Sequence, residues 1–298
     1  MSPLRIAEKV KRLLSGYFEK SPEKLVFCRD KIAIWSNRFE EMEHVIEAKR
    51  SGSCLPAFPA NTRDEPLEKI ILHGDAVWNA VGNPPRHAMP GMISEEETRY
   101  YNYIADYYSG AGEAVELGPW LGRSTLYILD GLVRNPNFAG GKLHVVDDFI
   151  WRSAWMDPNL KGFDIPPEKI PPNHASFRSL FERYTVEAAG RMAVTEAKLV
   201  DYDGNEHLPR FTWAGDPVEM LFVDCGRTIE ANKAWYATLK NSFIPHRTLI
   251  VMQDWQVFKE IPRRWYNQTN LFTAELGAEL ELIHELRSGG VATFLYRG

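Results

Sequence analysis

Residues 113–133 of the chain read EAVELGPWLGRSTLYILDGLV. The segment opens with an apolar run that ends at the acid Glu116, and a turn with two glycines, Gly118 and Gly122, follows. This order predicts a strand, then a glycine turn, then a helix. The apolar face of the predicted helix has helical spacing and consists of Leu126, Leu129 and Val133.

The glycine turn is suited to holding a ligand. Glycine takes positive φ and lets a ligand approach the backbone closely. The N-terminus of the following helix presents unpaired N–H groups and the positive end of the helix dipole. We therefore expect a polar or anionic ligand above Gly118–Ser124. The alternative is a turn of an ordinary α/β protein without a ligand. The spacing Glu116-x-Gly118-x-x-x-Gly122 differs from the G-x-G-x-x-G of dinucleotide-binding proteins.

The sequence VELGPWLGRST resembles motif I of class I S-adenosylmethionine (SAM) methyltransferases. It is most similar to a bacterial branch, methyltransferase family 24, that includes small-molecule and sugar O-methyltransferases. The segment GMISEE, at residues 91–96, also resembles a helix start that precedes motif I in that branch, and Ser94 with Glu97 three residues later predicts a capping box at this start. The resemblance implies that SAM is the cofactor and that the turn holds its amino-acid end. The implied cofactor-binding residues of the turn are Glu116, Gly118, Pro119, Trp120, Gly122 and Ser124.

Acids at the ends of later strands complete the expected cofactor site. Asp147 ends the β-rich run KLHVVD, and an acid at this place in a doubly wound sheet accepts the ribose hydroxyls. We favour Asp147 for the ribose, with Asp148 as the next candidate, over a pair of solvated acids. Asp201 follows the third expected strand. In SAM enzymes this position often touches the adenine, but an Asp-Gly turn explains the residues equally well.

The chain predicts an α/β fold with a doubly wound, seven-stranded, mostly parallel sheet. A C-terminal pair of β-like runs around Gly289-Gly290 predicts a hairpin, whose last strand should be antiparallel. Residues 1–90 lack the alternation of predicted strands and helices and are expected to be an N-terminal extension. Residues 91–298 are expected to form the SAM-binding domain. We expect strands near 113–117, 142–147, 193–200, 218–224, 248–253, 279–286 and 291–297.

Three residues near the ends of the fourth and fifth strands are candidate catalytic residues: Asp224, Arg227 and Asp254. The resembled branch commonly has histidine where this chain has Arg227. Arginine cannot act as a base at neutral pH but can clamp an anion, so we expect an anionic acceptor and give proton removal to Asp254. Related enzymes hold a divalent cation with such acids. Here one acid at the fifth strand, preceded by Gln253, leaves the metal site open.

The segment 149–175 is long and rich in proline, so it is expected to be a lid or substrate loop. Its aromatic residues either contact the adenine or the acceptor, or anchor the loop on the core. They are Trp151, Trp155, Phe163 and His174.

Composition limits the remaining function classes. The net charge is −5 and no block of Lys and Arg occurs, so nucleic acid is not an expected partner. Three cysteines without metal-ligand spacing indicate free thiols in a reducing compartment. No apolar run reaches the length of a membrane span, so we expect no membrane partner and a cytoplasmic location. The sequence leaves the oligomeric state open.

We expect SAM-dependent O-methylation of a sugar, glycan or natural-product acceptor. One alternative is a methyltransferase-fold protein that binds SAM or another nucleoside without methylating and acts as an accessory or scaffold protein. A nicotinamide-dependent oxidoreductase is the third hypothesis. The absent G-x-G-x-x-G and the terminal hairpin argue against it.

Overall fold

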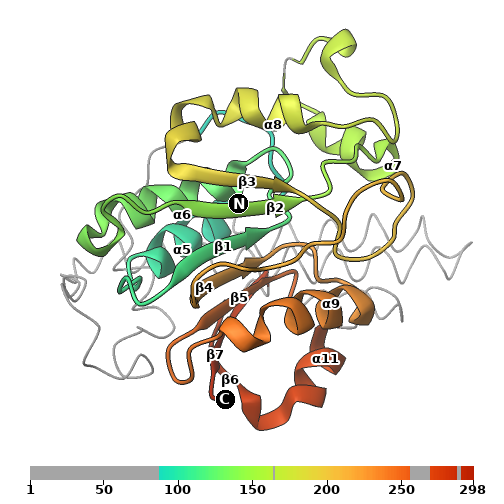
Figure 1. Cartoon of the computed structure of the whole chain (residues 1–298). Helices are drawn as coiled ribbons and strands as arrows, with labels where there is room; N and C mark the ends of the chain where they lie inside the picture. The colour runs from blue at the N-terminus through green and yellow to red at the C-terminus, as the bar shows by residue number, and fades with distance from the viewer. Residues whose placement is uncertain (1–86, 164, 256–268, 287–289) are drawn as a thin grey trace, which may run out of the picture.

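A computed structural model describes residues 87–163, 165–255, 269–286 and 290–298. A seven-stranded sheet with the order β3-β2-β1-β4-β5-β7-β6 runs through its centre (Figure 1). Strands β1 to β5 are parallel, and β7 is antiparallel to both of its neighbours. The strands are β1 (Glu113–Leu117), β2 (Leu143–Asp147), β3 (Met192–Glu196), β4 (Val218–Val223), β5 (Leu249–Gln253), β6 (Leu280–Glu285) and β7 (Val291–Tyr296).

The predicted fold class is confirmed, including the antiparallel last strand. Each expected strand range contains or overlaps its observed strand within a few residues. The third strand is the exception in length, because it ends at Glu196 and not near residue 200. Beyond that point the backbone of Lys198 leaves β2 and bonds instead to Pro209 and Phe211, at 2.9 and 2.8 Å.

The helices that flank the sheet begin and end where local chemistry favours it. Helix α5 opens with the predicted capping box, in which Ser94 Oγ accepts from Glu97 N and Glu97 Oε2 accepts from Ser94 N. The sequence FRSLFERYTVEAA, at residues 177–189, predicts one helix, but the observed helix ends at Tyr184 and residues 186–191 form 3₁₀ turns. The helices are α5 (Glu95–Ala105), α6 (Arg123–Arg134), α7 (Ser153–Met156), α8 (Arg178–Tyr184), α9 (Ile229–Leu239) and α11 (Thr269–Leu276).

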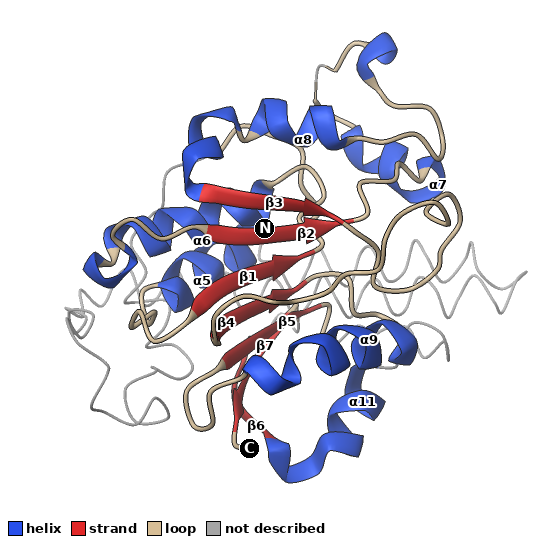
Figure 2. Cartoon of the chain, viewed as in Figure 1, coloured by secondary structure: helices blue, strands red, loops and turns tan. Residues whose placement is uncertain are grey.

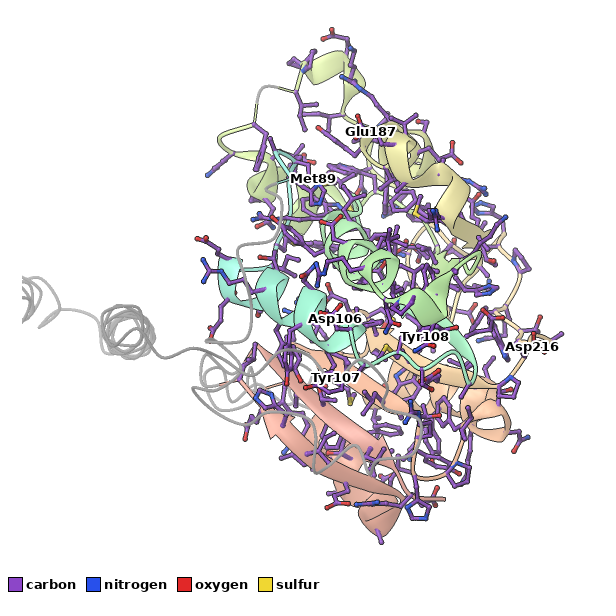
Figure 3. The ribbon with its side chains drawn as sticks, turned by 90° about the vertical axis from the view of Figure 1, so that its left-hand side faces the viewer. Met89, Asp106, Tyr107, Tyr108, Glu187 and Asp216 are labelled. Atoms are coloured by element: carbon purple, nitrogen blue, oxygen red, sulfur yellow. The ribbon has the colours of Figure 1, made fainter. Side chains whose placement is uncertain are left out.

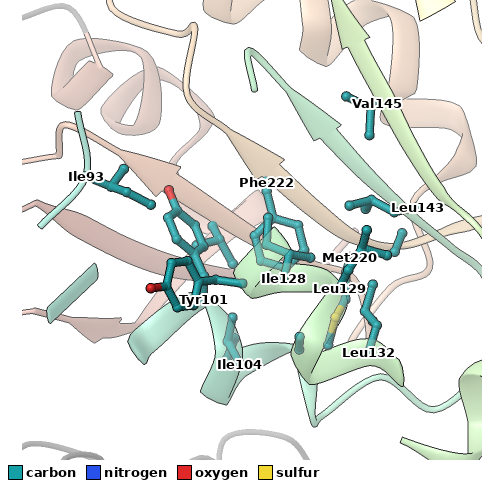
Figure 4. Close-up of a cluster of buried hydrophobic side chains, with 14 of the residues drawn as sticks. Ile93, Tyr101, Ile104, Ile128, Leu129, Leu132, Leu143, Val145, Met220 and Phe222 are labelled. Carbon is teal, nitrogen blue, oxygen red and sulfur yellow. The ribbon is translucent and has the colours of Figure 1, made fainter. Parts of the chain in front are cut away.

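Helices cover both faces of the sheet, so the core has two parts (Figure 2). One cluster packs α5, α6 and α8 against one face, and the other packs α9 and α11 against the opposite face. Strand residues alternate between the clusters, as Met220 and Phe222 enter the first and Leu221 and Val223 the second. Figure 4 shows part of the first cluster, in which the rings of Tyr101 and Phe222 pack edge to face.

The chain between α5 and β1 is fixed by a buried acid. Figure 3 shows Asp106, Tyr107 and Tyr108 where α5 ends and the chain turns toward the sheet. The carboxylate of Glu219 accepts from Ser109 N at 2.6 Å and Ala111 N at 2.7 Å. These bonds set the level at which β1 enters the sheet beside β4.

The expected N-terminal extension over residues 1–90 lies almost wholly outside the described residues, and it stays a prediction. The sequence also predicts a hairpin over residues 24–35 and a helix over residues 257–266, and both lie outside the described residues too.

Candidate active site

The glycine turn lies where the direction of the sheet order reverses. Strand β1 has β2 on one side and β4 on the other, and ligands of doubly wound sheets bind at the carboxyl ends of such a pair. Gly118 follows β1 with φ +85°, and a Cβ there would lie 2.9 Å from the carbonyl oxygen of Asp224. Glycine is therefore required for β1 and β4 to end side by side.

The second glycine of the turn starts helix α6. Gly122 has φ +92° and is the N-cap residue, without a side chain that could bond the helix N–H groups. A Cβ at this position would overlap the Thr185 side chain. The N-terminus of α6 therefore keeps N–H groups for a ligand, as the sequence predicts.

In the described part of the chain, one carboxyl oxygen of Glu116 is hydrogen-bonded and the other is not. Its side chain is 1% exposed, and Oε1 accepts from Ser124 Oγ at 2.6 Å. Oε2 is buried and has no hydrogen-bond partner in the described part of the chain. Burial raises the pKa of Glu116 to about 7, against the lowering effect of Ser124 and Thr125. A cationic ligand group beside Oε2 would satisfy this oxygen and restore its charge.

Of the two acids that end β2, Asp147 has the fewer partners. Its Oδ1 accepts from Phe149 N at 2.6 Å. Burial, and then the charge of Asp148, raise the pKa of Asp147 well above its usual range. Asp148 instead accepts from both terminal nitrogens of Arg152, at 3.1 and 2.6 Å, and from Asn205. Burial opposes ionisation of Asp148, but these partners lower its pKa.

Asp201 has different partners from Asp147 and Asp148. Its exposed carboxylate forms ion pairs with Lys198 at 3.0 Å and with Arg210 at 2.6 Å. The hydrogen bond from Lys198 is the main cause of its lowered pKa. This geometry accounts for the residue as part of a surface turn, so the adenine contact stays a prediction.

The expected acceptor side brings Asp224, Arg227 and Asp254 together. Arg227 forms an ion pair with Asp254, which follows β5 with the uncommon φ of +58°. Burial and then the charge of Asp254 raise the pKa of Asp224 well above its usual range, whereas Arg227 lowers it. Within the described residues, the Asp224 side chain has no hydrogen bond or ion pair, so it is the carboxyl group left for a ligand.

Sequence reasoning missed three residues that stand behind this acid pair. Gln253 at the end of β5 donates to Glu97 Oε1 at 2.9 Å and accepts from the Tyr101 hydroxyl at 2.6 Å. Burial raises the pKa of Glu97, so this side chain resists ionisation. The capping box identified Glu97 only as a helix start. Its second role was not visible because it depends on the contact between α5 and β5.

The segment 149–175 follows β2 and is joined to the site through Arg152, which holds Asp148. Trp151 is fully buried and packs against Phe177, so it anchors the segment on the core. Trp155 is 43% exposed and Phe163 is 37% exposed, so these two remain available to contact a ligand.

Neither a metal centre nor a membrane span is found in the part of the chain that the structure describes. No group of three or more His, Cys, Asp or Glu side chains there has the arrangement of a metal site. No helix there combines the length and the apolar character needed to cross a bilayer.

Comparison with known families adds an independent observation to this geometry. A family profile described as a methyltransferase domain, Methyltransf_24, matches residues 115–255, which run from β1 to just past β5. The chain carries a methyltransferase domain. The matched domain is that of a SAM-dependent methyltransferase, and the strand order of the sheet agrees with it. A comparison with curated proteins gives no match.

Solved structures with a similar chain path include several methyltransferases. The O-methyltransferase NovP is 13% identical, with a TM-score of 0.47, covering 72% of this chain and 84% of NovP. Cofactor-bound Rv0187 from MTB is 17% identical, with a TM-score of 0.45, covering 75% of this chain and 85% of Rv0187. A putative O-methyltransferase from Klebsiella pneumoniae is 16% identical, with a TM-score of 0.45, covering 80% of this chain and 97% of the Klebsiella protein.

The residues of the methyltransferase domain fit SAM. The cofactor has an ammonium group, and Glu116 has a buried oxygen without a partner. Asp147 offers a carboxyl group with a single backbone donor at the end of the next strand.

Proposed function

We propose that this methyltransferase methylates a hydroxyl oxygen of a small-molecule acceptor such as a sugar, glycan or natural product. The observation that carries the proposal is the Asp224 carboxyl group, which has no side-chain partner in the described chain, while the backbone of Asp224 lies against Gly118 of the glycine turn. An acceptor hydroxyl must lose its proton on methylation, and a carboxylate within hydrogen-bond reach can take it. The resemblance of motif I to small-molecule and sugar O-methyltransferases supports the acceptor class.

Each residue of the site has a role in this proposal. Glu116 and Asp147 hold the two ends of SAM, which supplies a methyl group on a positively charged sulfur when bound. The positive charge of bound SAM favours the ionised form of Asp224, which orients the acceptor hydroxyl and receives its proton. The ion pair of Arg227 with Asp254 fixes the far wall of the site. Alignment of the acceptor oxygen accounts for much of the rate in such a displacement.

The charges of the site change the expectation of an anionic acceptor. Arg227 is paired with Asp254, and the charges of Glu97 and Glu116 both lie near enough to raise the pKa of Asp224. An anionic acceptor would meet this excess of acids, so we favour a neutral acceptor with several hydroxyl groups. Proton removal, which the sequence alone assigned to Asp254, falls to Asp224 because Asp254 already bonds Arg227.

An activity assay tests the proposal. S-adenosylhomocysteine release is measured with neutral glycosides, sugar acids and phosphorylated sugars as acceptors. We expect turnover with a neutral acceptor and a loss of roughly 10²–10⁴ in kcat for Asp224→Asn, with SAM affinity retained. Glu182→Gln, which removes an exposed ion pair with Arg178 on α8, is the matched control and keeps its activity. Full turnover by Asp224→Asn would remove this residue from proton transfer. SAM binding without turnover on any acceptor would favour the accessory role.

A further inference from the structure

The amide of Gln253, at the end of β5, is engaged inside the core. Its Oε1 accepts from the Tyr101 hydroxyl at 2.6 Å, and its Nε2 donates to Glu97 Oε1 at 2.9 Å. All three side chains are buried, and a Cβ built on Gly290 would lie 1.7 Å from Glu97 Oε1. Helix α5 and the chain that enters β7 therefore close around this amide, and its oxygen is committed to Tyr101.

Asp254, the next residue, is held in one conformation and is paired with a cation. It has the uncommon φ of +58°, and Trp255 after it donates its backbone N–H to Gly290 O at 3.2 Å. The indole N–H of Trp255 donates to Glu285 at 2.9 Å. Both neighbours of Asp254 in the chain are thus anchored, and its carboxylate forms the ion pair with Arg227.

The backbone that carries Arg227 is anchored by two buried side chains. Asn232 Nδ2 and Thr269 Oγ1 both donate to the carbonyl oxygen of Gly226, the second at 3.0 Å. A Cβ on Gly226 would lie 2.4 Å from Asn232 Oδ1, so the loop after β4 packs directly on α9. The Arg227 side chain therefore starts from an anchored backbone and ends on an anchored carboxylate.

These residues do not fit a divalent cation of the kind that related enzymes hold. Hard cations take several oxygen ligands, and carboxylates are the preferred ones. Asp254 is already paired with Arg227, and Gln253 is committed to the core, so Asp224 is the one acid of this set left for a ligand. Burial and the charge of Asp254 raise the pKa of Asp224 and Arg227 lowers it, so the guanidinium lies close enough to repel a metal ion on that acid.

We propose that the Arg227 guanidinium takes the place of a divalent cation on the acceptor side, and that methyl transfer by this chain requires no metal ion. The inference rests on the proposed methylation of a hydroxyl group. When the acceptor O–H bond breaks, its electron pair stays on the oxygen and the proton passes to Asp224. Arg227, which is always protonated at neutral pH and has a side chain 44% exposed, stabilises the charge that develops on that oxygen.

Chelation and metal binding test whether the chain uses a metal ion. With SAM and a neutral glycoside, wild-type turnover should be unchanged by EDTA and by added Mg²⁺ or Mn²⁺. Mn²⁺ titrated into the complex with S-adenosylhomocysteine should stay unbound, as its paramagnetic resonance signal reports. Turnover that is lost on chelation and restored by Mg²⁺ would overturn the inference. Mn²⁺ that binds the wild type but not Asp224→Asn would overturn it as well.

Variants of Arg227 test the role of the guanidinium. Arg227→Ala should lower kcat by roughly 10²–10³, because it removes a group that stabilises charge on the reacting oxygen. Its affinity for S-adenosylhomocysteine should be unchanged, which shows that the variant folds. Guanidinium chloride at a non-denaturing concentration should restore part of the rate, whereas NaCl at the same ionic strength should not. Arg227→Lys should keep part of the rate, since it retains the charge without the planar fork.

Arg134→Ala is the matched control, since it removes a guanidinium paired with Asp106 at the far end of α6. It should keep the wild-type rate and should not respond to guanidinium. Full turnover by Arg227→Ala would overturn the inference and leave the proposed function standing. If the wild type turned over no acceptor with or without metal, the proposed function would fall, and this inference with it.

Discussion

Glu116 is the residue whose hydrogen bonding and ionisation a ligand should change most. It is buried at the end of β1, shares one oxygen with Ser124 and leaves the other without a partner. Burial raises its pKa to about 7, so the ligand-free site at neutral pH holds a mixture of neutral and charged Glu116. A ligand ammonium would favour the charged form.

We predict that Glu116 makes the stability of the ligand-free chain fall with pH. Its folded pKa of about 7 lies above the unfolded value, so the folded state binds the proton more tightly. The contribution is present below about pH 4.5 and is lost as the pH rises through about 7, by up to about 3 kcal/mol. Glu116→Gln keeps an oxygen for Ser124 but does not titrate. Urea unfolding from pH 5 to 8 should show that the free energy of unfolding falls with pH in the wild type but not in the variant.

Saturating S-adenosylhomocysteine provides the control for this experiment. Its ammonium pairs with the charged carboxylate, so the wild type should then be the more stable chain above pH 7. Parallel stability curves for the two ligand-free chains would contradict the prediction.

Single residues also mark the limit of sequence reasoning. The acids at the strand ends could be identified because each follows an apolar run, as Asp147 and Asp224 do. Their partners could not be identified, because Arg227 and Asp254 are brought together only by the loops after β4 and β5. The engagement of Asp148 by Arg152 and Asn205 depends in the same way on a folded loop.

At the scale of an element, α5 links the start of the domain to the catalytic edge of the sheet. Its N-cap box satisfies the first turn, and Glu97 uses its remaining oxygen to bond Gln253 at the end of β5. Tyr101, one turn later, bonds the same glutamine. The helix therefore holds the residue that precedes Asp254.

We predict unequal effects for two substitutions at the start of α5. Ser94→Ala removes one cap and should cost about 1 kcal/mol of unfolding free energy. Glu97→Ala should cost about 1–3 kcal/mol more, because it also leaves the buried amide of Gln253 without its acceptor. Equilibrium urea unfolding measures both. Glu95→Ala, which removes an exposed ion pair with Arg99, should change stability by less than about 0.5 kcal/mol. Equal costs for Ser94→Ala and Glu97→Ala would show that the bond to β5 adds nothing.

The elements that the sequence predicted well are those with a local signal. Alternating or continuous apolar runs bounded by turns defined all seven strands, and the capping box defined the start of α5. The end of α8 was missed because Thr185 ends the helix after Tyr184, with its hydroxyl bonded to the Phe181 carbonyl. The end of β3 was missed because Lys198 pairs with residues more than ten positions later.

At the scale of the molecule, the parallel strands gather the site. Because β1, β2, β4 and β5 run in one direction, the residues that follow them meet at one edge of the sheet. Gly118 and Asp224 are adjacent there, although they are far apart in the sequence. A ligand at this edge contacts several strands, so its binding energy should stabilise the fold as a whole.

We predict that S-adenosylhomocysteine stabilises the whole domain through Asp147. At 100 times its Kd, the ligand should add about 2.7 kcal/mol to the free energy of unfolding. Asp147→Asn removes the charge that accepts the ribose hydroxyls and should weaken binding roughly tenfold. At the same ligand concentration, the free energy of unfolding of Asp147→Asn should then rise by only about 1.4 kcal/mol. Asp201→Asn loses an acid that already serves Lys198 and Arg210, so it should gain as much as the wild type. Thermal unfolding with and without ligand separates the two acids. A reduced gain in Asp201→Asn with a full gain in Asp147→Asn would move the nucleoside from the end of β2 to the turn after β3.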